Sequence, residues 1–490
     1  MEEQFNIRLE KLKKLGALGI TPYPYRFDVS HRFKDIIARY QDFSADELKE
    51  VPDEIRSAGR IIAIRSMGKS AFMHLFDGEK KLQIYLRKEM VTERDFALYH
   101  LLDIGDIIGV KGRIFKTHTH ELSILVNELT FLAKSFHPLP EKWHGLQDKE
   151  LRFRQRYLDL IVNPEVKDIF RKRSLIIQNI RSFFHQQGYI EVETPMMHQI
   201  PGGASARPFT THHNALNIDL FLRVAPELYL KRLLVGGMEK VFEINRNFRN
   251  EGISMMHNPE FTMIEFYELY KDFNDYMNLT EALLLNLNRE LLPDNTIQWQ
   301  ERSISLQPPF KRVKFMAIIA EKSGLALEQL WDEAELKKFI ARQFPDEPLP
   351  PTFGKMLELM FDFYVEKNLI EPTFVINYPK AISPLSKMSR TDERETERFE
   401  LYIAGMEIAN GFSELNDPLE QRRRFEAQLQ DREKGDDEAQ LIDNNFLNAL
   451  EYGMAPAAGE GIGIDRLVML YTGAASIKEV ILFPLLRPRE

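Results

Sequence analysis

A predicted strand–loop–strand segment over residues 242–270 carries more charge than its apolar surroundings suggest. Five of its charged residues lie on or beside two runs that otherwise look buried, namely Glu243, Arg249, Glu251, Glu265 and Glu268. Buried charge is costly unless it is paired, so this concentration favours a binding site. The alternative is an exposed hairpin with a solvated charged face.

A glycine-rich string later in the chain could bind phosphate. The string Gly459-Glu-Gly-Ile-Gly-Ile-Asp-Arg466 runs directly into a predicted helix. Glycines before a helix let the backbone approach a phosphate or a flat ring, and Arg466 can engage phosphate oxygens. Alone, the string would also fit a simple tight turn.

Two carboxylates, Glu400 and Glu407, lie seven residues apart on neighbouring extended segments. Both could reach a cation that bridges polyphosphate oxygens, as Mg²⁺ does. Two surface acids are the alternative, because the sequence does not fix which of these side chains face the core.

Composition excludes several kinds of chemistry. The chain has no cysteine, so disulfides, thiolate catalysis and cysteine-bound zinc are excluded. A net charge of −9 argues weakly against a nucleic-acid binder, although a local basic patch on an acidic enzyme can bind RNA. No apolar run is long enough to cross a bilayer. The start lacks the apolar core of a secretory signal, and its early acids argue against a mitochondrial transit peptide. We therefore expect a cytoplasmic protein without membrane contact.

The length of 490 residues indicates two or three domains. We expect a helical extension over 1–54, a β-rich domain over 55–134, a linker over 135–160 and a large α+β domain over 161–490. Within the large domain, residues 276–370 look mostly helical, and we interpret them as an insertion.

The β-rich domain shows five short strand patterns, with a helical stretch after the third. The strand patterns cover residues 59–64, 72–76, 82–86, 107–115 and 122–126. This order suits an OB-fold, a small barrel that often binds oligonucleotides. A barrel with a purely structural role is the alternative.

Residues 5–16 have the apolar spacing of an amphipathic helix, with basic residues largely on its other faces, namely Arg8, Lys11, Lys13 and Lys14. A solvated surface helix would explain this pattern, and so would a helix that contacts RNA. The residues alone favour the solvated helix.

Three segments of the large domain resemble motifs 1, 2 and 3 of class II aminoacyl-tRNA synthetases. They are a helix–strand unit that ends at Pro195, the charged hairpin and the glycine-rich string. Further strings are similar to the bacterial lysyl members of that family, namely Gly202-Gly-Ala-Ser-Ala-Arg207, Ala225-Pro-Glu-Leu-Tyr229, Phe248-Arg-Asn-Glu251, His257-Asn-Pro-Glu-Phe261 and Asn410-Gly-Phe-Ser-Glu-Leu415. The resemblance covers nearly the whole chain, with all segments in order.

The resemblance implies a mostly antiparallel sheet flanked by helices, and a homodimer built through motif 1. It also implies an enzyme that activates L-lysine with ATP, releases pyrophosphate and transfers lysine to the 3′-terminal adenosine of tRNA(Lys). Such a reaction needs no protein nucleophile, because positioning and neutralisation of phosphate charge carry the catalysis.

By the same resemblance, Arg249 and Arg466 are the catalytic arginines, on the α- and γ-phosphates of ATP. Phe261 would stack on the adenine ring. The remaining implied contacts with ATP are Glu251, His257, Asn258 and Glu407, and the implied Mg²⁺ ligands are Glu400 and Glu407.

A lysine site needs carboxylates at its far end, because an unpaired buried ammonium is costly. The resemblance implies Glu265 and Glu414 for the ε-ammonium, with a hydrogen bond from Tyr267. The other implied lysine contacts are Gly203 and Glu227 for the α-amino group, Asn410 for the carboxylate, and Arg249 and Phe412.

In the barrel, Phe72, Gln83 and Glu121 match positions that stack on and read anticodon bases in the family. Bases splayed onto an aromatic side chain are a common way to read single-stranded RNA. With this context we assign the N-terminal basic helix to the tRNA backbone.

Three positions depart from the family pattern: Met256, Ala409 and Glu460 stand where relatives often have arginine, glycine and an apolar residue. An acid at 460 would weaken nucleotide binding unless it points away from the phosphates. Lys387-Met-Ser-Arg390 resembles the Lys-Met-Ser-Lys-Ser loop of class I synthetases. Its partner signature His-Ile-Gly-His is absent, so we interpret it as a mobile basic loop near the rim of the site.

The sequence bears on three alternative functions. A paralogue that lysylates a protein such as elongation factor P would lack the N-terminal barrel. An aspartyl or asparaginyl synthetase would not need carboxylates at 265 and 414. A non-catalytic relative would usually lose a motif arginine or a magnesium acid, and this chain keeps all four.

Overall fold

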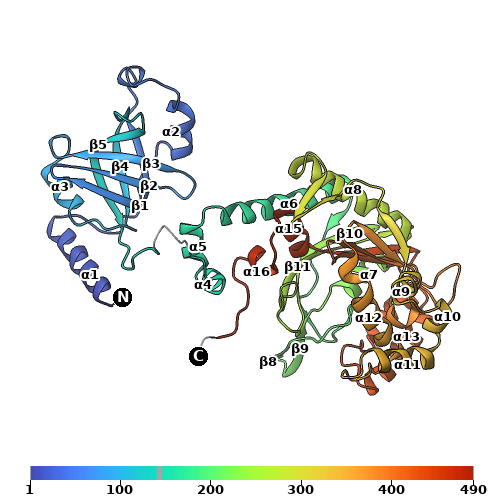
Figure 1. The fold of residues 1–490 in the computed structure, drawn as a ribbon. Coiled ribbons are helices and arrows are strands. Elements are labelled where there is room, and N and C mark those ends of the chain that lie inside the picture. Colours follow the sequence, from blue (N-terminus) through green and yellow to red (C-terminus); the bar gives the residue numbers. More distant parts are fainter. Residues whose placement is uncertain (1, 141–145, 489–490) are drawn as a thin grey trace. The chain divides into compact units, whose positions relative to one another are not determined.

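The chain folds into two compact units, Met1–Lys167 and Asp168–Glu490 (Figure 1). The computed structural model describes residues 2–140 and 146–488. Residues 141–145 of the predicted linker, and the ends of the predicted first and last domains at 1 and 489–490, therefore lie outside the described part. The two units divide inside α6 (Val166–Gln186).

The first unit is built on a closed five-stranded barrel with the strand order β1-β2-β3-β5-β4. The strands are β1 (Ile55–Met67), β2 (Ser70–Phe76), β3 (Lys81–Arg87), β4 (Ile107–Lys116) and β5 (Leu122–Ala133), and α3 (Glu93–Tyr99) follows β3. Alternate apolar side chains of the strands fill the barrel. The prediction of five strands with a helix after the third is confirmed.

The N-terminal helix α1 (Glu2–Ala17) is held to the barrel unit by its basic residues. Arg8 is 7% exposed, and its Nη1 donates to the carbonyl oxygens of Ile104, Ser135 and His137 at 3.2, 2.6 and 3.2 Å. Lys11 Nζ lies 2.6 Å from an oxygen of Asp103. Two of the four basic side chains thus serve the fold, which leaves fewer for an RNA backbone than the sequence pattern suggested.

Three further helices belong to this unit: α2 (Phe33–Tyr40), α4 (Lys149–Arg154) and α5 (Arg156–Val162). Asp159 joins the last two, because it accepts hydrogen bonds from Arg152 at 2.7 Å and Arg156 at 2.6 Å. Within the described residues, no helix of the chain is both long enough and apolar enough to cross a membrane.

The second unit contains an eight-stranded sheet with the order β14-β15-β16-β17-β18-β11-β10-β6. Neighbouring strands are antiparallel except at the two edges, where β6 pairs in parallel with β10 and β14 pairs in parallel with β15. The strands are β6 (Ile190–Glu191), β10 (Lys240–Phe248), β11 (Glu260–Leu269), β14 (Lys311–Lys314), β15 (Thr373–Ile376), β16 (Arg398–Ile403), β17 (Met406–Ser413) and β18 (Ala457–Gly463). The predicted α+β class with a mostly antiparallel sheet is confirmed.

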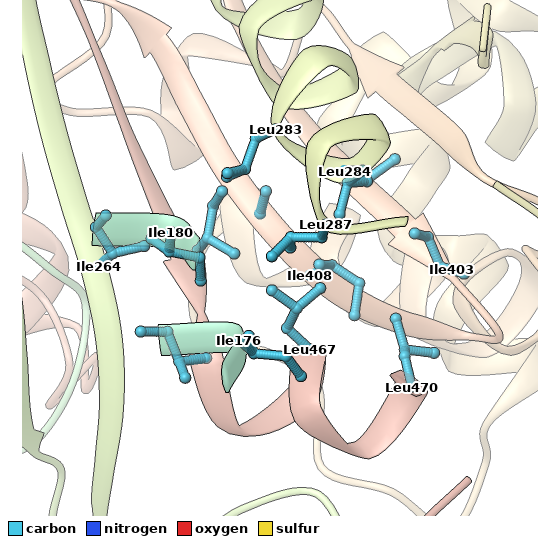
Figure 2. Packing of buried hydrophobic residues seen from close by; sticks show 14 of the residues in the cluster. Ile176, Ile180, Ile264, Leu283, Leu284, Leu287, Ile403, Ile408, Leu467 and Leu470 are labelled. Atoms are coloured by element: carbon cyan, nitrogen blue, oxygen red, sulfur yellow. The ribbon is translucent and has the colours of Figure 1, made fainter. Parts of the chain in front are cut away.

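Three helices cover one face of this sheet: α6, α8 (Phe273–Leu291) and α15 (Ile464–Thr472). Figure 2 shows their aliphatic side chains meeting those of the strands, namely Ile176 and Ile180 of α6, Leu283, Leu284 and Leu287 of α8, Leu467 and Leu470 of α15, and Ile264, Ile403 and Ile408 of the sheet. All of them are buried, so this face is the hydrophobic core and the opposite face remains for chemistry.

The segment 276–370 differs from the predicted helical insertion. It contains α9 (Phe315–Ser323), α10 (Leu327–Trp331), α11 (Glu333–Gln343) and α12 (Phe353–Tyr364), but also the hairpin β12 (Thr296–Trp299) and β13 (Arg302–Ser305) and the edge strand β14. Pairing of β14 with β15 makes part of this segment integral to the large sheet. The sequence Lys-Arg-Val-Lys of β14 has no apolar alternation, so only backbone pairing defines this strand.

The remaining elements flank the open face and one end of the sheet. They are a small sheet of β7 (Met197–His198), β9 (Ile218–Leu222) and β8 (Thr210–His213), and the helices α7 (Glu227–Val235), α13 (Pro418–Glu433), α14 (Asn444–Glu451) and α16 (Ile477–Val480). Apolar residues of α7, α13 and α14 form one cluster with Val241 and Leu269 of the central strands.

Glu460 is an unusual acid on the core face of the sheet. Glu460 of β18 is 2% exposed, and its two oxygens lie 2.6 and 2.8 Å from Thr280 Oγ1 of α8. Thr280 also donates to the carbonyl oxygen of Tyr276, so a protonated Glu460 that donates to the hydroxyl satisfies both groups. Burial raises the pKa of Glu460 well above its usual range, in agreement with a neutral acid. Strand alternation therefore turns this unusual residue away from the open face.

We expect Glu460→Gln to remove part of the loss of stability at alkaline pH. A carboxyl whose pKa is raised by folding stabilises the protein fully below its unfolded pKa of about 4.3, and that contribution is lost as pH rises through the folded value. Thermal unfolding of both proteins between about pH 5 and pH 9 should show the variant gaining on the wild type as pH rises. Parallel curves would contradict a protonated Glu460.

We expect Arg8→Ala to destabilise the barrel unit by roughly 2 kcal/mol or more, because it removes a charged donor shared by three carbonyl groups. Differential scanning calorimetry would measure the shift of that unit's transition. Lys14→Ala, on an exposed position of the same helix, is the matched control and should leave the transition within about 0.5 kcal/mol. Equal effects of the two changes would show that Arg8 does not anchor α1.

Candidate active site

The open face of the large sheet forms the floor of a cavity of about 430 Å³. Residues directly opposite one another on paired strands share a face, so the register creates rows of side chains across the sheet. One row runs across β11, β18, β17 and β16 through Glu265, Gly461, Asn410 and Glu400. The adjacent row contains Tyr267, Gly459, Phe412 and Arg398. Residues separated by more than a hundred positions thus meet through backbone pairing alone.

The motif 3 glycines let neighbouring side chains approach the backbone of β18 closely in the middle of this floor. A Cβ at Gly459 would overlap an oxygen of Glu414 and the ring of Tyr267. One at Gly461 would lie 2.6 Å from the end of Met263. Glycine is therefore required at 459, where a Cβ would clash with a ring and a buried carboxylate, whereas at 461 the flexible end of Met263 would have to move.

A β-bulge brings Glu407 to the same face as Glu400. The register between β16 and β17 shifts so that Leu401 opposes Ala409 and Tyr402 opposes Glu407. Tyr402 shares its face with Glu400, and the bulge at Ile408 places Glu407 there too. Both carboxylates therefore face the cavity, which the sequence alone did not determine.

Three donors surround Glu400. Tyr378 and Tyr402 donate to Oε2 at 2.7 and 2.5 Å, and Arg398 Nη2 lies 2.5 Å from Oε1. Burial raises the pKa of Glu400, and the charge of Arg398 opposes that rise while Glu407 adds to it. None of these three donors was predicted from the sequence. In the described residues, no group of three or more His, Cys, Asp or Glu side chains has the arrangement of a metal site.

Arg466 is held in place at the motif 3 end of the cavity. Its Nη1 donates to the carbonyl oxygen of Glu407 at 2.8 Å and lies 3.2 Å from Oε2 of the same residue. Its Nη2 lies 3.0 Å from Nε2 of His257. Because a guanidinium only donates, Nε2 must be the acceptor, and the His257 proton lies on Nδ1, 2.9 Å from Ser254 Oγ. Burial and Arg466 lower the pKa of His257, which agrees with a neutral ring.

Arg249 lines the same cavity, and its guanidinium lies 5.1 Å from the centre of the Phe261 ring. Its Nε is buried without a hydrogen-bond partner, and no carboxylate in the described residues pairs with it. An arginine that lines a cavity without a counter-charge is suited to bind an anionic ligand. Glu251 and Asn258 also line the cavity, so the predicted nucleotide residues are brought together.

The other end of the cavity is acidic. Glu265 is 4% exposed, and Tyr267 donates to it at 3.2 Å. Burial and the charge of Glu227 raise the pKa of Glu265 well above its usual range. Gly203 closes this end with a left-handed φ of +90°, and its N–H donates to Gln440 at 3.3 Å. A Cβ at Gly203 would lie 3.1 Å from Glu227 Cβ, so glycine permits this close approach.

Glu414 is the one predicted nucleotide or lysine residue that does not line the cavity. It is fully buried behind the wall, and Lys231 Nζ lies 2.5 Å from its Oε2. Lys231 also donates to Glu227 at 2.6 Å and is fully buried. Lys231 was not predicted as a site residue, although its position four residues after Glu227, among the buried leucines of α7, was a signal.

The segment Lys387–Arg390 is anchored, which corrects the expectation of a mobile loop. Arg390 lies 2.8 Å from both Asp272 and Glu397, and Lys387 donates to Asn416 at 2.8 Å. Its backbone also bonds to Ser413 next to the cavity floor. The ion pair of Arg390 with Asp272 joins this segment to a distant part of the chain, and local sequence does not reveal such a pair.

The predicted anticodon residues lie together on the barrel. The Phe72 ring stacks on Tyr85 with a centroid distance of 4.3 Å, since the two residues are cross-strand neighbours. Gln83 Nε2 donates to Glu121 at 2.8 Å, and Ser123 donates to Gln83 at 2.9 Å. An aromatic platform beside a polar pair is the arrangement that stacks and reads unpaired bases.

Comparison with known proteins agrees with this geometry. Residues 148–487 match the family model of class II tRNA synthetases (D, K and N), and residues 55–132 match that of the OB-fold nucleic acid binding domain. The chain is 52% identical over 492 residues to a lysine–tRNA ligase of Pelotomaculum thermopropionicum, covering 100% of this chain and 96% of that protein. It is 50% identical over 490 residues to that of Shouchella clausii and 49% over 494 residues to that of Bacillus subtilis, with 100% of this chain and 98% of each relative covered. The chain therefore belongs to the class II tRNA synthetases, among the lysine–tRNA ligases.

Proposed function

We propose that the chain activates L-lysine with ATP, releases pyrophosphate and transfers the lysyl group to the 3′-terminal adenosine of tRNA(Lys). The observation that carries the proposal is the polarity of the cavity. Arg249 and Arg466 line one part of it, while Glu227 and Glu265 line another. A triphosphate and a substrate with two ammonium groups need these two environments side by side.

On this proposal, ATP binds between the arginines. Arg249 neutralises the α-phosphate and Arg466 the γ-phosphate, with Phe261 against the adenine ring. The free guanidinium of Arg249 and the neutral state of His257 support this assignment, since neither side chain would have to abandon a strong partner. The other nucleotide contacts are Glu251, Asn258 and Glu407.

The lysine substrate occupies the acidic end. Glu227 and the loop between β7 and β8 at Gly203 bind its α-ammonium, and Asn410 and Phe412 lie beneath its carboxylate and chain. Glu265 and Tyr267 bind the ε-ammonium, with Glu414 contributing charge from behind the wall. Burial raises the pKa of Glu265, and an ammonium bound beside it would lower that pKa and favour the charged carboxylate.

Mg²⁺ fits the donors on β16 and β17. This ion usually binds through one or two carboxylates plus substrate phosphates, so Glu400 and Glu407 suffice. Both line the cavity, and Glu407 raises the pKa of Glu400, which a cation near the two would offset. When bound, the ion would neutralise charge on the polyphosphate.

The chain's own part in the reaction is to position and to neutralise. The lysine carboxylate attacks the α-phosphorus in line, and the bond to pyrophosphate breaks. Arg249 is poised to stabilise the charge that grows on the α-phosphate oxygens, and the apolar core behind the floor keeps the strands fixed. A 3′-terminal hydroxyl of tRNA then takes the lysyl group from the adenylate.

Recognition of tRNA falls to the barrel, where Phe72 would stack on an anticodon base while Gln83 and Glu121 read base edges. We further propose that the enzyme is a cytoplasmic homodimer. Exposed apolar side chains near motif 1 support a subunit interface, namely Ile190, Met196 and Met197 at 52%, 43% and 53% exposure. Sedimentation would distinguish a dimer from a monomer.

The function is tested by pyrophosphate exchange with each of the twenty amino acids. L-Lysine should be the substrate that supports exchange best. Exchange that depends instead on aspartate or asparagine would refute the proposal.

We expect Arg249→Ala to lower lysine-dependent pyrophosphate exchange by at least about 10²–10³-fold, because it removes a preorganised cation from the developing phosphate charge. Arg246→Ala is the matched control. Arg246 lies on the same hairpin, pairs with Glu260 at 2.7 Å and is exposed, so exchange should stay near the wild-type rate. Near-normal exchange in the Arg249 variant would remove this residue from the site.

We expect Phe72→Ala to weaken aminoacylation of tRNA(Lys) by about tenfold or more, since loss of base stacking costs roughly 1–3 kcal/mol. Pyrophosphate exchange should remain unchanged because it needs no tRNA. Measurement of both activities on the same preparation separates the two steps. An equal fall in both would refute the anticodon role.

A further inference from the structure

Lys231 places a resident ammonium group behind the acidic end of the cavity. It lies on α7 and contacts two carboxylates: Glu227, which lines the cavity, and Glu414, which does not. Burial opposes its charge, but Glu227 and Glu414 more than offset this effect and raise the pKa of Lys231. The aromatic rings of Phe412 and Phe446, at 5.1 and 5.9 Å, complete its surroundings. Lys231 is therefore a stable cation in the wall.

The charges of this wall can be counted. Glu227, Glu265 and Glu414 bring three negative charges and Lys231 brings one positive charge, which leaves two negative charges when all are ionised. Arg398, the next cation along the floor, is matched by Glu400 at 2.5 Å. Two is also the number of ammonium groups on lysine. Without Lys231 the same wall would hold three buried carboxylates for two cations, and an excess buried charge is strongly unfavourable.

Glu227 depends on Lys231 most directly. Its Oε1 accepts from Lys231 at 2.6 Å, and burial raises the pKa of Glu227 while Lys231 opposes the rise. Glu414 depends on Lys231 in the same way, since burial raises the pKa of Glu414 and the charge of Lys231 opposes that rise. Its Oε1 has no hydrogen-bond partner in the structure and points toward Gly459 and Tyr267 at the floor. Both carboxylates are thus aimed at the cavity by a cation that stays behind them.

We propose that Lys231 is a positioning residue of the amino-acid site: it holds Glu227 and Glu414 in place from behind and supplies their counter-charge, and so fits the pocket to a substrate with two ammonium groups. The inference rests on the proposed lysine specificity and deepens it. Lys231 does not touch the reacting atoms, so it acts on substrate binding and leaves the binding of ATP unchanged.

The test uses the full-length enzyme and compares Lys231→Met, Glu414→Gln and the double variant Lys231→Met/Glu414→Gln. Lys231→Met keeps the length of the side chain and removes its charge, so the KM for L-lysine in pyrophosphate exchange should rise at least about tenfold, a factor worth about 1.4 kcal/mol. The KM for ATP should stay within about twofold of the wild-type value. The double variant restores the count of two negative charges, so its KM for L-lysine should lie closer to wild type than that of either single variant.

Lys240→Met is the matched control. Lys240 also pairs with a buried acid, Glu268 at 2.9 Å, but that pair does not line the cavity. This variant should leave both KM values unchanged. A merely structural role for Lys231 would instead lower the melting temperature and alter both KM values, or kcat alone.

Each outcome decides the proposal. An unchanged KM for L-lysine in folded Lys231→Met overturns it, and so does a double variant whose defect is the sum of the two single defects. If Lys231→Met does not fold, the comparison of Glu414→Gln with the double variant decides alone. Failure of the wild-type enzyme to use L-lysine would refute the proposed function instead, so the two failures are distinct.

Discussion

The site depends on the cross-strand register of β11, β18, β17 and β16. Four strands from three distant stretches of the chain pair so that acidic, amide and aromatic side chains form two rows over a line of glycines. A shift of one residue in any strand would turn its functional groups into the hydrophobic core and its aliphatic groups toward the ligands. The aliphatic layer under α6, α8 and α15 therefore has a functional purpose, because it makes every other register unfavourable.

This arrangement also explains how one face can hold opposite charges without collapse. Among the described residues, Arg249 near the phosphate end has no carboxylate partner and Arg466 has one, Glu407, whereas Glu227 and Glu414 at the other end share a buried ammonium. Charges that must meet a ligand are left available, and those that must not drift are fixed by neighbours from other elements. The acid at 460 obeys the same logic, because alternation places it where a threonine hydroxyl can satisfy it.

Local patterns were sufficient for the parts of the fold that repeat them. The barrel strands follow period-two apolar alternation, and the charged hairpin was visible because charge interrupts such alternation. The identity of the nucleotide and lysine residues came from resemblance to a family. Three kinds of information were absent from local sequence: the edge strand β14, whose residues are polar; the bulge at Ile408; and the partners of buried ions such as Lys231 and Arg398. All three are set by contacts between distant segments.

The bulge at Ile408 links the number of residues in the hairpin between β16 and β17 to the face on which its acids lie. Glu407 and Asn410 lie three positions apart on β17, so a perfectly regular strand could not present both on one face; the single extra residue places Glu407 on the face that holds Asn410 and Glu400. Deletion of one residue from this hairpin would therefore move an acid to the other face of the sheet. Any relative with a shorter hairpin here would need its second carboxylate at a different offset, and that offset would serve as a diagnostic of how its turn is built.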